Sequence, residues 1–557
     1  MIFYYLMLFF SGVLLTLLGG LFTVGEVFVT INLGVMNPIE MSFILDAWGM
    51  SFGAVVSLIS GSVMIFSTYY MEGETHKRRF GLLILLFVLS MYTLVVSGNM
   101  VSLMVGWDGL GVTSFLLVIY YQSKSSLAAG MLTTLANRVG DVMFMLALVG
   151  MSGVFVFDFV TAVESGLPVL LCSLVILGSC TKSAHIPFSS WLPAAMAAPT
   201  PVSTLVHSST LVTAGLFVMI RFSAGLEGFF CYGVLGVSAC FTCLMAGSCA
   251  SLEPDLKKVV AFSTLSQLGV MGMAIDSFQM PDLALFHLVV HALFKALMFM
   301  CVGCVILMSF GVQESRYFSG LYYKMPVISM WLVVSCLSLS GFPFFAGCFS
   351  KDLLLEGALS SGLSTVGVFF VYGTCFFTAV YSLRVVVLMF SGDGGQPCSS
   401  YKETKSYYFS TFLLGVGSVI GGIFFQCMFI DYNVHCSVST LSKLGIFLSV
   451  GLGGLLYLIL SFEKGLLSSL AHFLVEFVMN MFFLKGLSGS PLANGFLGWS
   501  YKVESMETNV EMFLGEGAPK DSHSSLVGGA GVPLHWGVVA FVLYYAIAGL
   551  TFFWMVS

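Results

Sequence analysis

Apolar residues fill the 557-residue chain in runs of about 20, separated by short polar stretches. A helical run of that length spans the ~30 Å hydrocarbon core of a bilayer. Charged residues make up 9% of the chain, against about 25% in soluble domains. The pattern predicts an all-α polytopic membrane protein of about fifteen transmembrane helices. These are expected near 3–24, 47–70, 80–98, 100–121, 127–150, 167–184, 201–222, 228–250, 256–276, 282–308, 327–350, 363–390, 408–430, 443–461 and 536–556.

Two of the runs exceed 30 residues and are interrupted in the middle. The sixth continues through Pro187 and Pro193, and the eleventh through Gly341 and Pro343. Non-helical backbone at membrane depth is tolerated only where it is buried or lines a wet cavity. The two broken helices are five spans apart, so they cross the membrane in opposite directions. This indicates two inverted five-helix repeats, each with one broken helix, as in many transporters.

The same count of spans divides the chain. We expect N-terminal helices with an outer hairpin over 1–79, a first repeat over 80–222, and a second over 223–390. Additional helices follow over 391–461, then an interfacial segment over 462–535 and a C-terminal anchor over 536–557. Within the interfacial segment, 466–486 is apolar but charged, and is read as an interfacial helix or a sixteenth span. The acidic stretch from Glu504 fits an amphipathic segment and a disordered linker equally well.

The positive charges of the short loops indicate the orientation. With the N-terminus inside, the inner loops carry ten cationic residues and the outer loops only Arg221 and Lys443, which satisfies the positive-inside rule. The ten are Lys77, Arg78, Arg79, Lys124, Lys257, Lys258, Arg316, Lys324, Lys402 and Lys405.

One predicted helix carries three titratable residues at helical spacing. His287, His291 and Lys295 recur every four residues, so they form one polar stripe roughly 12 Å long. A lysine at the bilayer centre costs about 3 kcal/mol or more. The stripe therefore requires partners or water.

Further ionisable residues lie within other predicted spans: Asp108, Lys182, His207, and the pair Lys351 and Asp352 at the second break. Arg138 and Asp141 stand three apart on one helix and favour a structural ion pair. His207 fits a hydrogen-bonded core histidine as well as a functional one. The intramembrane lysines are harder to explain without a function or a partner. Asp108 is the only acid of the fourth span, so a pairing of Asp108 with Lys182 is one hypothesis.

This set of residues suits proton movement. A desolvated lysine beside a carboxylate exchanges its proton when that carboxylate moves, and neutral histidine takes and gives protons near pH 7. Other chemistry finds little support. The 14 cysteines show no metal-ligand spacing and are read as small core residues. Nucleotide, flavin and iron–sulfur signatures, and a signal peptide, are not recognisable.

Seven ordered motifs resemble the chain 5 family of NADH–ubiquinone oxidoreductases, the distal antiporter-like membrane subunits of respiratory complex I. They are GWDGLG (106–111), NRVGD (137–141), TKSAH (181–185), PTPVSTLVHSST (199–210), DLKKVVAFSTLSQLG (255–269), HLVVHALFK (287–295) and FSKD (349–352). The resemblance is strong over about 22–430.

The resemblance implies a proton path. Asp108 matches the family's buried acid, usually Glu, and Lys182 the lysine paired with it. His207, His287, His291 and Lys295 match the central hydrophilic axis, and Lys351 with Asp352 the exit side. The chain would hold no cofactor or metal of its own; NADH, FMN, iron–sulfur clusters and ubiquinone are implied in partner subunits. Implied partners are the neighbouring antiporter-like subunit, other membrane-arm and accessory subunits, and lipid such as cardiolipin, with no nucleic acid.

Two departures from the family pattern matter. Asp108 is one methylene shorter than Glu, so its contact with Lys182 is expected to need a water. Only one apolar run precedes Asp46, whereas the family usually has two, and residues 26–32 resemble the hairpin after the second. We therefore expect the family's first helix to be missing and the N-terminus to lie on the matrix side. The absence of a targeting sequence and 32 methionines suit an organelle-encoded protein of the mitochondrial inner membrane, in an invertebrate form.

Two other functions fit the same residues. A stand-alone Na⁺(K⁺)/H⁺ antiporter subunit shares this core and would move cations without NADH oxidation. A purely structural membrane-arm subunit would tolerate the loss of Lys182 or Lys295 without loss of redox-linked pumping.

Overall fold

The computed structural model describes residues 12, 27–32, 40–154, 169–226, 230–276, 280–318, 320–360, 365–390, 405–429, 440–462, 475–487, 498 and 500–505. The chain divides into two compact units, Met1–Ser488 and Gly489–Ser557. In the second unit the described residues are 498 and 500–505, which are helical. The architecture below is that of the first unit.

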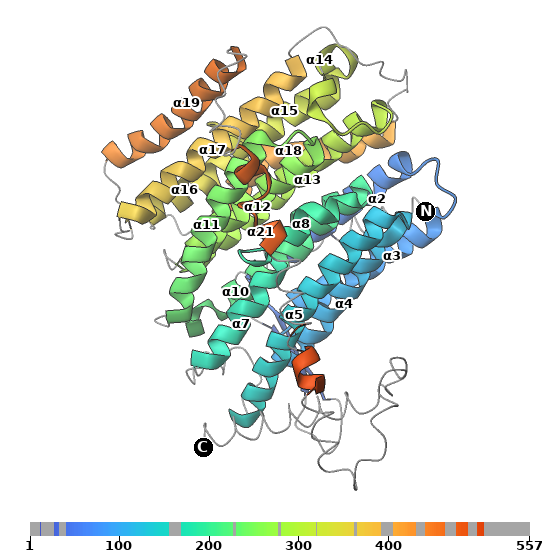
Figure 1. The fold of residues 1–557 in the computed structure, drawn as a ribbon, viewed down its shortest axis with the longest axis vertical. Helices are drawn as coiled ribbons and strands as arrows, with labels where there is room; N and C mark the ends of the chain where they lie inside the picture. Colours follow the sequence, from blue (N-terminus) through green and yellow to red (C-terminus); the bar gives the residue numbers. More distant parts are fainter. Residues whose placement is uncertain are drawn as a thin grey trace, which may run out of the picture. The chain divides into compact units, whose positions relative to one another are not determined.

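Long helices occupy the predicted apolar runs (Figure 1). The first repeat contains α3 (Lys77–Val95), α4 (Met100–Val118), α5 (Lys124–Val154), α7 (Val169–Lys182), α8 (Trp191–Ala194), α9 (Thr200–Leu205) and α10 (Leu211–Leu226). The second contains α11 (Phe230–Leu252), α12 (Leu256–Asp276), α13 (Pro281–Met308), α14 (Leu321–Lys324), α15 (Pro326–Ser340), α16 (Ala346–Ser360) and α17 (Thr365–Phe390). Helix α2 (Ala47–Tyr70) precedes them, and α18 (Lys405–Phe429), α19 (Thr440–Phe462) and α21 (Leu484–Leu487) follow.

Ten helices in the described part of the chain are long and apolar enough to cross a membrane, and 169–182, 326–340 and 443–459 form shorter apolar helices. The predicted helical membrane protein is confirmed. The spans expected at 3–24 and 536–556 lie outside the described residues.

A β-hairpin precedes α2, at the place expected for the outer hairpin. Strands β1 (Val27–Asn32) and β2 (Glu40–Leu45) pair antiparallel, with Val27 opposite Leu45. Asp46 follows directly and caps α2 by accepting a hydrogen bond from the amide of Gly49 (3.0 Å). The same carboxylate accepts two hydrogen bonds of 2.8 Å from Arg221 at the far end of α10. This bidentate pair fastens the start of α2 to the first repeat.

The first predicted break lies between α7 and α8. Helix α7 ends at Lys182, and a peptide in the cis form joins Ile186 and Pro187. Ending a helix leaves carbonyls without intrahelical partners. One of them, on Thr181, accepts a hydrogen bond from the indole Nε1 of Trp191 (2.9 Å). The tryptophan thus satisfies the backbone that the break exposes.

The second break lies between α15 and α16. Gly341 ends α15 in the left-handed conformation (φ +81°), which glycine adopts without strain. After the break, α16 packs very closely on the end of α15. A Cβ on Gly347 would lie 1.7 Å from the carbonyl oxygen of Ser338, so only glycine fits there.

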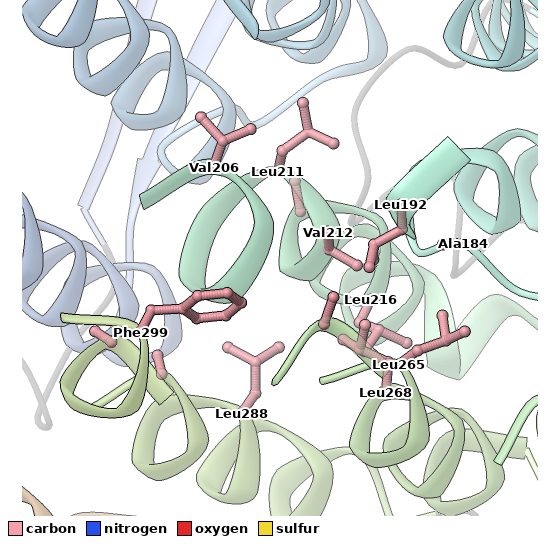
Figure 2. Packing of buried hydrophobic residues seen from close by; sticks show 14 of the residues in the cluster. Ala184, Leu192, Val206, Leu211, Val212, Leu216, Leu265, Leu268, Leu288 and Phe299 are labelled. Carbon is pink, nitrogen blue, oxygen red and sulfur yellow. The ribbon is translucent and has the colours of Figure 1, made fainter. Parts of the chain in front are cut away.

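Helix α13 is the centre of the unit. It packs against α2, α9, α10, α12, α15, α16 and α18 (Figure 1), and every residue from Leu283 to Ile306 is buried. Apolar side chains fill the space between α10, α12 and α13, among them Leu216, Leu265, Leu268 and Leu288 (Figure 2). The polar side chains of α13 therefore lie within a largely apolar core.

The segment 466–486 differs from the single interfacial helix that we expected. Its described residues form a short helical stretch, a turn over 480–483 and the one-turn helix α21. Met481, Phe482 and Phe483 have positive φ values of 56–58°, which an α-helix cannot contain. The thiol of Cys249 donates to the carbonyl of Val478 (3.0 Å), which holds this segment against α11.

Candidate functional site

The predicted polar stripe lies on one face of α13. His287, His291 and Lys295 are buried, with at most 1% exposure each. The imidazole rings of His287 and His291 have centroids 6.1 Å apart. The stripe is confirmed as a buried row of bases in an apolar helix, a costly arrangement that requires an explanation.

His287 joins three helices through hydrogen bonds. Its Nδ1 lies 2.9 Å from the hydroxyl of Ser350 on α16, and its Nε2 lies 3.3 Å from Oε1 of Gln267 on α12. Because an amide oxygen only accepts, Nε2 carries the proton in this arrangement, and Nδ1 accepts from Ser350. The Gln267 amide in turn donates to the hydroxyl of Tyr381 on α17 (3.4 Å).

The other two members of the stripe have fewer fixed partners. The Lys295 ammonium donates to the hydroxyl of Ser263 on α12 (2.6 Å). Within the described residues, no carboxylate forms an ion pair with it, and both ring nitrogens of His291 lack a hydrogen-bond partner. Buried polar groups are normally satisfied, and ordered water is the usual partner where protein supplies none.

Lys182 is the last residue of α7 and is fully buried. Its ammonium donates to the backbone carbonyl of Trp107 (2.6 Å) and lies 3.8 Å from the centroid of the same indole ring. The indole Nε1 donates to Asp141 (2.9 Å). A carbonyl and an aromatic face, rather than a carboxylate, are therefore the direct partners of this lysine.

Asp108 and Lys182 form no direct ion pair in the described part of the chain, and the water-mediated contact expected between them stays a prediction. Asp108 faces Arg138 instead, with 3.9 Å between their nearest charged atoms. The reason lies in helix geometry: Trp107 occupies the face of α4 toward α7, so the next residue points away from it. Asp141 and Lys182 both contact Trp107, Asp141 through the indole N–H and Lys182 through the backbone carbonyl.

Arg138 and Asp141 form the predicted ion pair on α5 (3.1 Å). Together with Asp108 they make a three-charge cluster on the outer face of α4 and α5. The Arg138 and Asp108 side chains are 60% and 48% exposed in the isolated chain. Charges at membrane depth require cover from other protein or from water.

His207 lies in a π-helical turn, Val206–Thr210, between α9 and α10. Such turns are rare and are frequent at functional sites. The side chain is 1% exposed, its two nitrogens lack hydrogen-bond partners within the described chain, and its ring centroid lies 6.2 Å from that of Trp191. His207 thus lies beside the residue that supports the first break.

Lys351 and Asp352 follow the second break on α16. The Lys351 ammonium donates to the hydroxyl of Thr378 (3.0 Å) and more weakly to the carbonyl of Leu339 (3.4 Å) near the end of α15. Asp352 accepts from the thiol of Cys348 (3.0 Å). Since Ser350 contacts His287, the stripe on α13 reaches the second break through adjacent residues of α16.

The structure adds residues that the sequence did not single out. Ser263, Gln267, Ser350 and Thr378 supply hydrogen bonds to Lys295, His287 and Lys351. Their only signal in the sequence is a polar residue within an apolar run, a signal that dozens of buried serines and threonines share. His185, within the first break, is also buried and lies 3.3 Å from the hydroxyl of Thr242. Among the described residues no group of three His, Cys, Asp or Glu could hold a metal ion.

Three family models match nearly the whole length. Residues 97–377 match the transmembrane family of NADH:quinone oxidoreductases and Mrp antiporters. Residues 32–81 match the N-terminus of complex I chain 5, and residues 381–519 match the C-terminus of NADH dehydrogenase subunit 5.

Curated relatives agree with these models. NADH-ubiquinone oxidoreductase chain 5 of Anopheles quadrimaculatus is 43% identical over 76% of this chain and 74% of its own length. The chain 5 protein of Locusta migratoria is 45% identical over 70% and 68%. That of Mytilus edulis is 37% identical over 87% and 86%.

Solved structures show the same fold. The Mrp complex from Dietzia sp. DQ12-45-1b matches with a TM-score of 0.75 and 22% identity, covering 97% of this chain and 60% of that chain. An archaeal membrane-bound sulfane sulfur reductase matches with a TM-score of 0.67 and 20% identity, covering 81% and 92%.

Two broken helices, a buried row of lysines and histidines and the match to the NADH:quinone oxidoreductase and Mrp antiporter family define an antiporter-like, proton-translocating membrane protein. Within that class, the chain belongs to the NADH–ubiquinone oxidoreductase chain 5 family of complex I. It is a proton-translocating membrane subunit of that enzyme, and the stand-alone antiporter is not favoured.

Proposed function

We propose that protons cross the subunit along Lys182, His207, His291, His287 and Lys351, with Lys295 as the central carrier. The observation that carries the proposal is the environment of Lys295. Its ammonium is fully buried at the middle of α13, and within the described residues it donates its hydrogen bond to the Ser263 hydroxyl. A permanently charged lysine would require a carboxylate there, whereas a lysine that gains and loses a proton does not.

Water would complete the path between these side chains. The ring nitrogens of His207 and His291 are buried without hydrogen-bond partners in the described chain, and leaving such a group unpaired costs about 1–3 kcal/mol. Water molecules beside these rings would remove that cost and link neighbouring bases. Each transfer moves one proton, and no residue is oxidised or reduced.

The carboxylates would control when the lysines release their protons. Asp141 and Asp108 attract Lys182, and Arg138 binds both acids. A shift of Arg138 toward or away from this cluster changes the negative charge that Lys182 experiences. At the second break, Asp352 is the neighbour of Lys351 in sequence. It would control the release of a proton from Lys351 as the acids near Lys182 would at the first break. One charge moved against 100 mV costs about 2.3 kcal/mol, which such shifts can supply.

We propose the neighbouring antiporter-like membrane subunit as the partner that covers α4 and α5. The Asp108–Arg138–Asp141 cluster lies on that face at membrane depth, surrounded by exposed apolar residues such as Leu135 and Val142. Lipid tails cannot stabilise three charges. Polar groups of a neighbouring protein would therefore contact these charged side chains. NADH, FMN, iron–sulfur clusters and ubiquinone would reside in other subunits of the complex.

We also propose the mitochondrial inner membrane as the location, with the N-terminus on the matrix side. The distribution of cationic residues in the loops supports this orientation. It places the end of α7 that bears Lys182 and the start of α12 toward the matrix.

Substitution of Lys295 by methionine tests the path. Methionine keeps the length and apolar stem of lysine, so assembly is expected to survive. In proteoliposomes holding the assembled complex, the protons moved per NADH oxidised, or the coupled rate itself, should fall. If the assembled variant keeps the wild-type proton-to-NADH ratio and the wild-type coupled rate, the subunit has only a structural role. NADH oxidation by a soluble electron acceptor is the control, since it bypasses the membrane arm.

A further inference from the structure

A cavity of about 380 Å³ opens beside the second half of the first broken helix. Its walls come from three places: Ser190 and Ala194 after the break, Glu253 and Lys258 around the start of α12, and the turn at Asn480. Water occupies ~30 Å³ per molecule in the liquid, so the cavity has room for several. It lies at the end of the bundle whose loops are cationic, the matrix end in the orientation proposed above.

Two adjacent lysines at this cavity have opposite environments. Lys258 is 41% exposed and forms ion pairs with Glu253 (3.3 Å) and Asp255 (2.5 Å). Lys257 is 3% exposed, and its ammonium donates to the backbone carbonyl of Ala198. No carboxylate lies within 4 Å of the Lys257 ammonium in the described part of the chain. The lysine also sits in the first turn of α12, where a cation is disfavoured by about 0.3–1 kcal/mol.

Lys257 is linked to the segment that lines the cavity, and its helix contacts the turn that carries His207. Ala198 directly follows Ala197, which lines the cavity, so the bond to Ala198 holds the Lys257 ammonium just behind the cavity wall. The π-helical turn that carries His207 packs against α12.

We infer that Lys257 is a further proton carrier, which takes protons from water in this matrix-facing cavity and passes them to His207. The inference rests on the proposed function, because it extends the same path to the surface. A hydronium ion in the cavity loses one O–H bond and becomes water, and its proton forms a new N–H bond on the neutral Lys257 amine. The resulting ammonium then gives one proton, through a bridging water, to His207, and the amine is restored. The ion-paired Lys258, Glu253 and Asp255 keep the mouth hydrated.

Substitution of Lys257 by arginine separates this role from a structural one. Arginine keeps the positive charge and can donate to the carbonyl of Ala198, but it does not release a proton in proteins. We expect assembled complex with Lys257→Arg to lose proton translocation as severely as Lys295→Met. Lys77→Arg is the matched control, because Lys77 also begins a helix at the same end of the bundle but lies at the surface. It should behave as wild type.

The outcomes distinguish the two proposals. If Lys295→Met abolishes translocation and Lys257→Arg leaves it unchanged, the proposed role of Lys257 is wrong, whereas the proton path through Lys295 is retained. If both variants translocate as wild type, the path itself fails.

A second measurement tests whether solvent reaches the cavity. Ser190→Cys places a thiol on the cavity wall, and Ser60→Cys places one in the dry core of α2, where Ser60 is fully buried. A small charged thiol reagent added on the matrix side should label the first site, identified by mass spectrometry, and not the second. An unlabelled Ser190→Cys in active complex would overturn the inference.

Discussion

Lys182 lies against Trp107 in two ways at once: its ammonium donates to the tryptophan carbonyl (2.6 Å) and lies 3.8 Å from the indole centroid. The same indole donates to Asp141 (2.9 Å). Trp107 is thus the physical link between the lysine of the first broken helix and the acid of α5. Any motion of α5 that shifts Asp141 acts on Lys182 through this ring.

Truncation of Trp107 should therefore impair proton transfer at Lys182. A desolvated cation–π contact contributes about 2 kcal/mol, which corresponds to roughly 30-fold in an equilibrium. We expect Trp107→Leu to lower NADH-driven translocation strongly. Trp107→Phe, which keeps an aromatic face but lacks the donor to Asp141, should give an intermediate loss. The measurement is translocation per assembled complex. Full activity of both variants would show that the ring has no part in the path.

The Ser350 hydroxyl should affect proton translocation through its hydrogen bond to His287. Its hydroxyl is the 2.9 Å partner of Nδ1, and a neutral hydrogen bond contributes about 1 kcal/mol, or roughly fivefold. Ser350→Ala is therefore expected to slow translocation a few-fold while the complex assembles normally. Ser62→Ala is the control, since that buried hydroxyl donates to the carbonyl of Ile59 on its own helix. Equal rates for the two variants would remove Ser350 from the path.

Gly347 should be intolerant of any side chain. A Cβ there would lie 1.7 Å from the carbonyl oxygen of Ser338, so Gly347→Ala must separate α15 from α16. We expect little assembled complex on native gels. Gly451→Ala in α19 is the matched control, because no described residue lies within 4 Å of its added Cβ, and alanine is more favourable than glycine in a helix by about 1 kcal/mol. Normal assembly of Gly347→Ala would contradict the close packing at the second break.

The Asp46–Arg221 pair should contribute to stability rather than to transport. Both side chains are only 10% exposed, and removal of one partner from a buried pair costs about 3–5 kcal/mol. Arg221→Leu is expected to lower the thermal stability of the complex markedly. Adding Asp46→Asn should restore part of it, because no unpaired carboxylate then remains. Stability that falls further in the double variant would show that the pair does not act as a unit.

The sequence predicts the fold well because lipid imposes a simple rule. Apolar runs of membrane length must be helices, and the bounds of α2 and α12 agree with the predicted runs 47–70 and 256–276. The breaks at Pro187 and Gly341 could be predicted because proline lacks a backbone N–H and glycine adopts positive φ values without strain. The stripe on α13 follows from helical periodicity alone.

The partners of the bases could not be predicted in the same way. Which face of α4 meets α7 depends on packing between distant helices, and this decides that Trp107, rather than Asp108, contacts Lys182. Gln267 and Ser350 reach His287 from two other helices, and neither stands out among the many polar residues of buried runs. Likewise, Lys257 and Lys258 are neighbours in sequence, yet only the structure shows that one is buried and the other ion-paired.

The most direct measurement is an experimental map of the whole complex at a resolution that shows ordered water. The account predicts water density between Lys182, His207, His291, Lys295 and Lys351, with each ammonium pointing into the bundle. Lysines directed at acyl chains, or apolar packing that separates them without any water between, would contradict it.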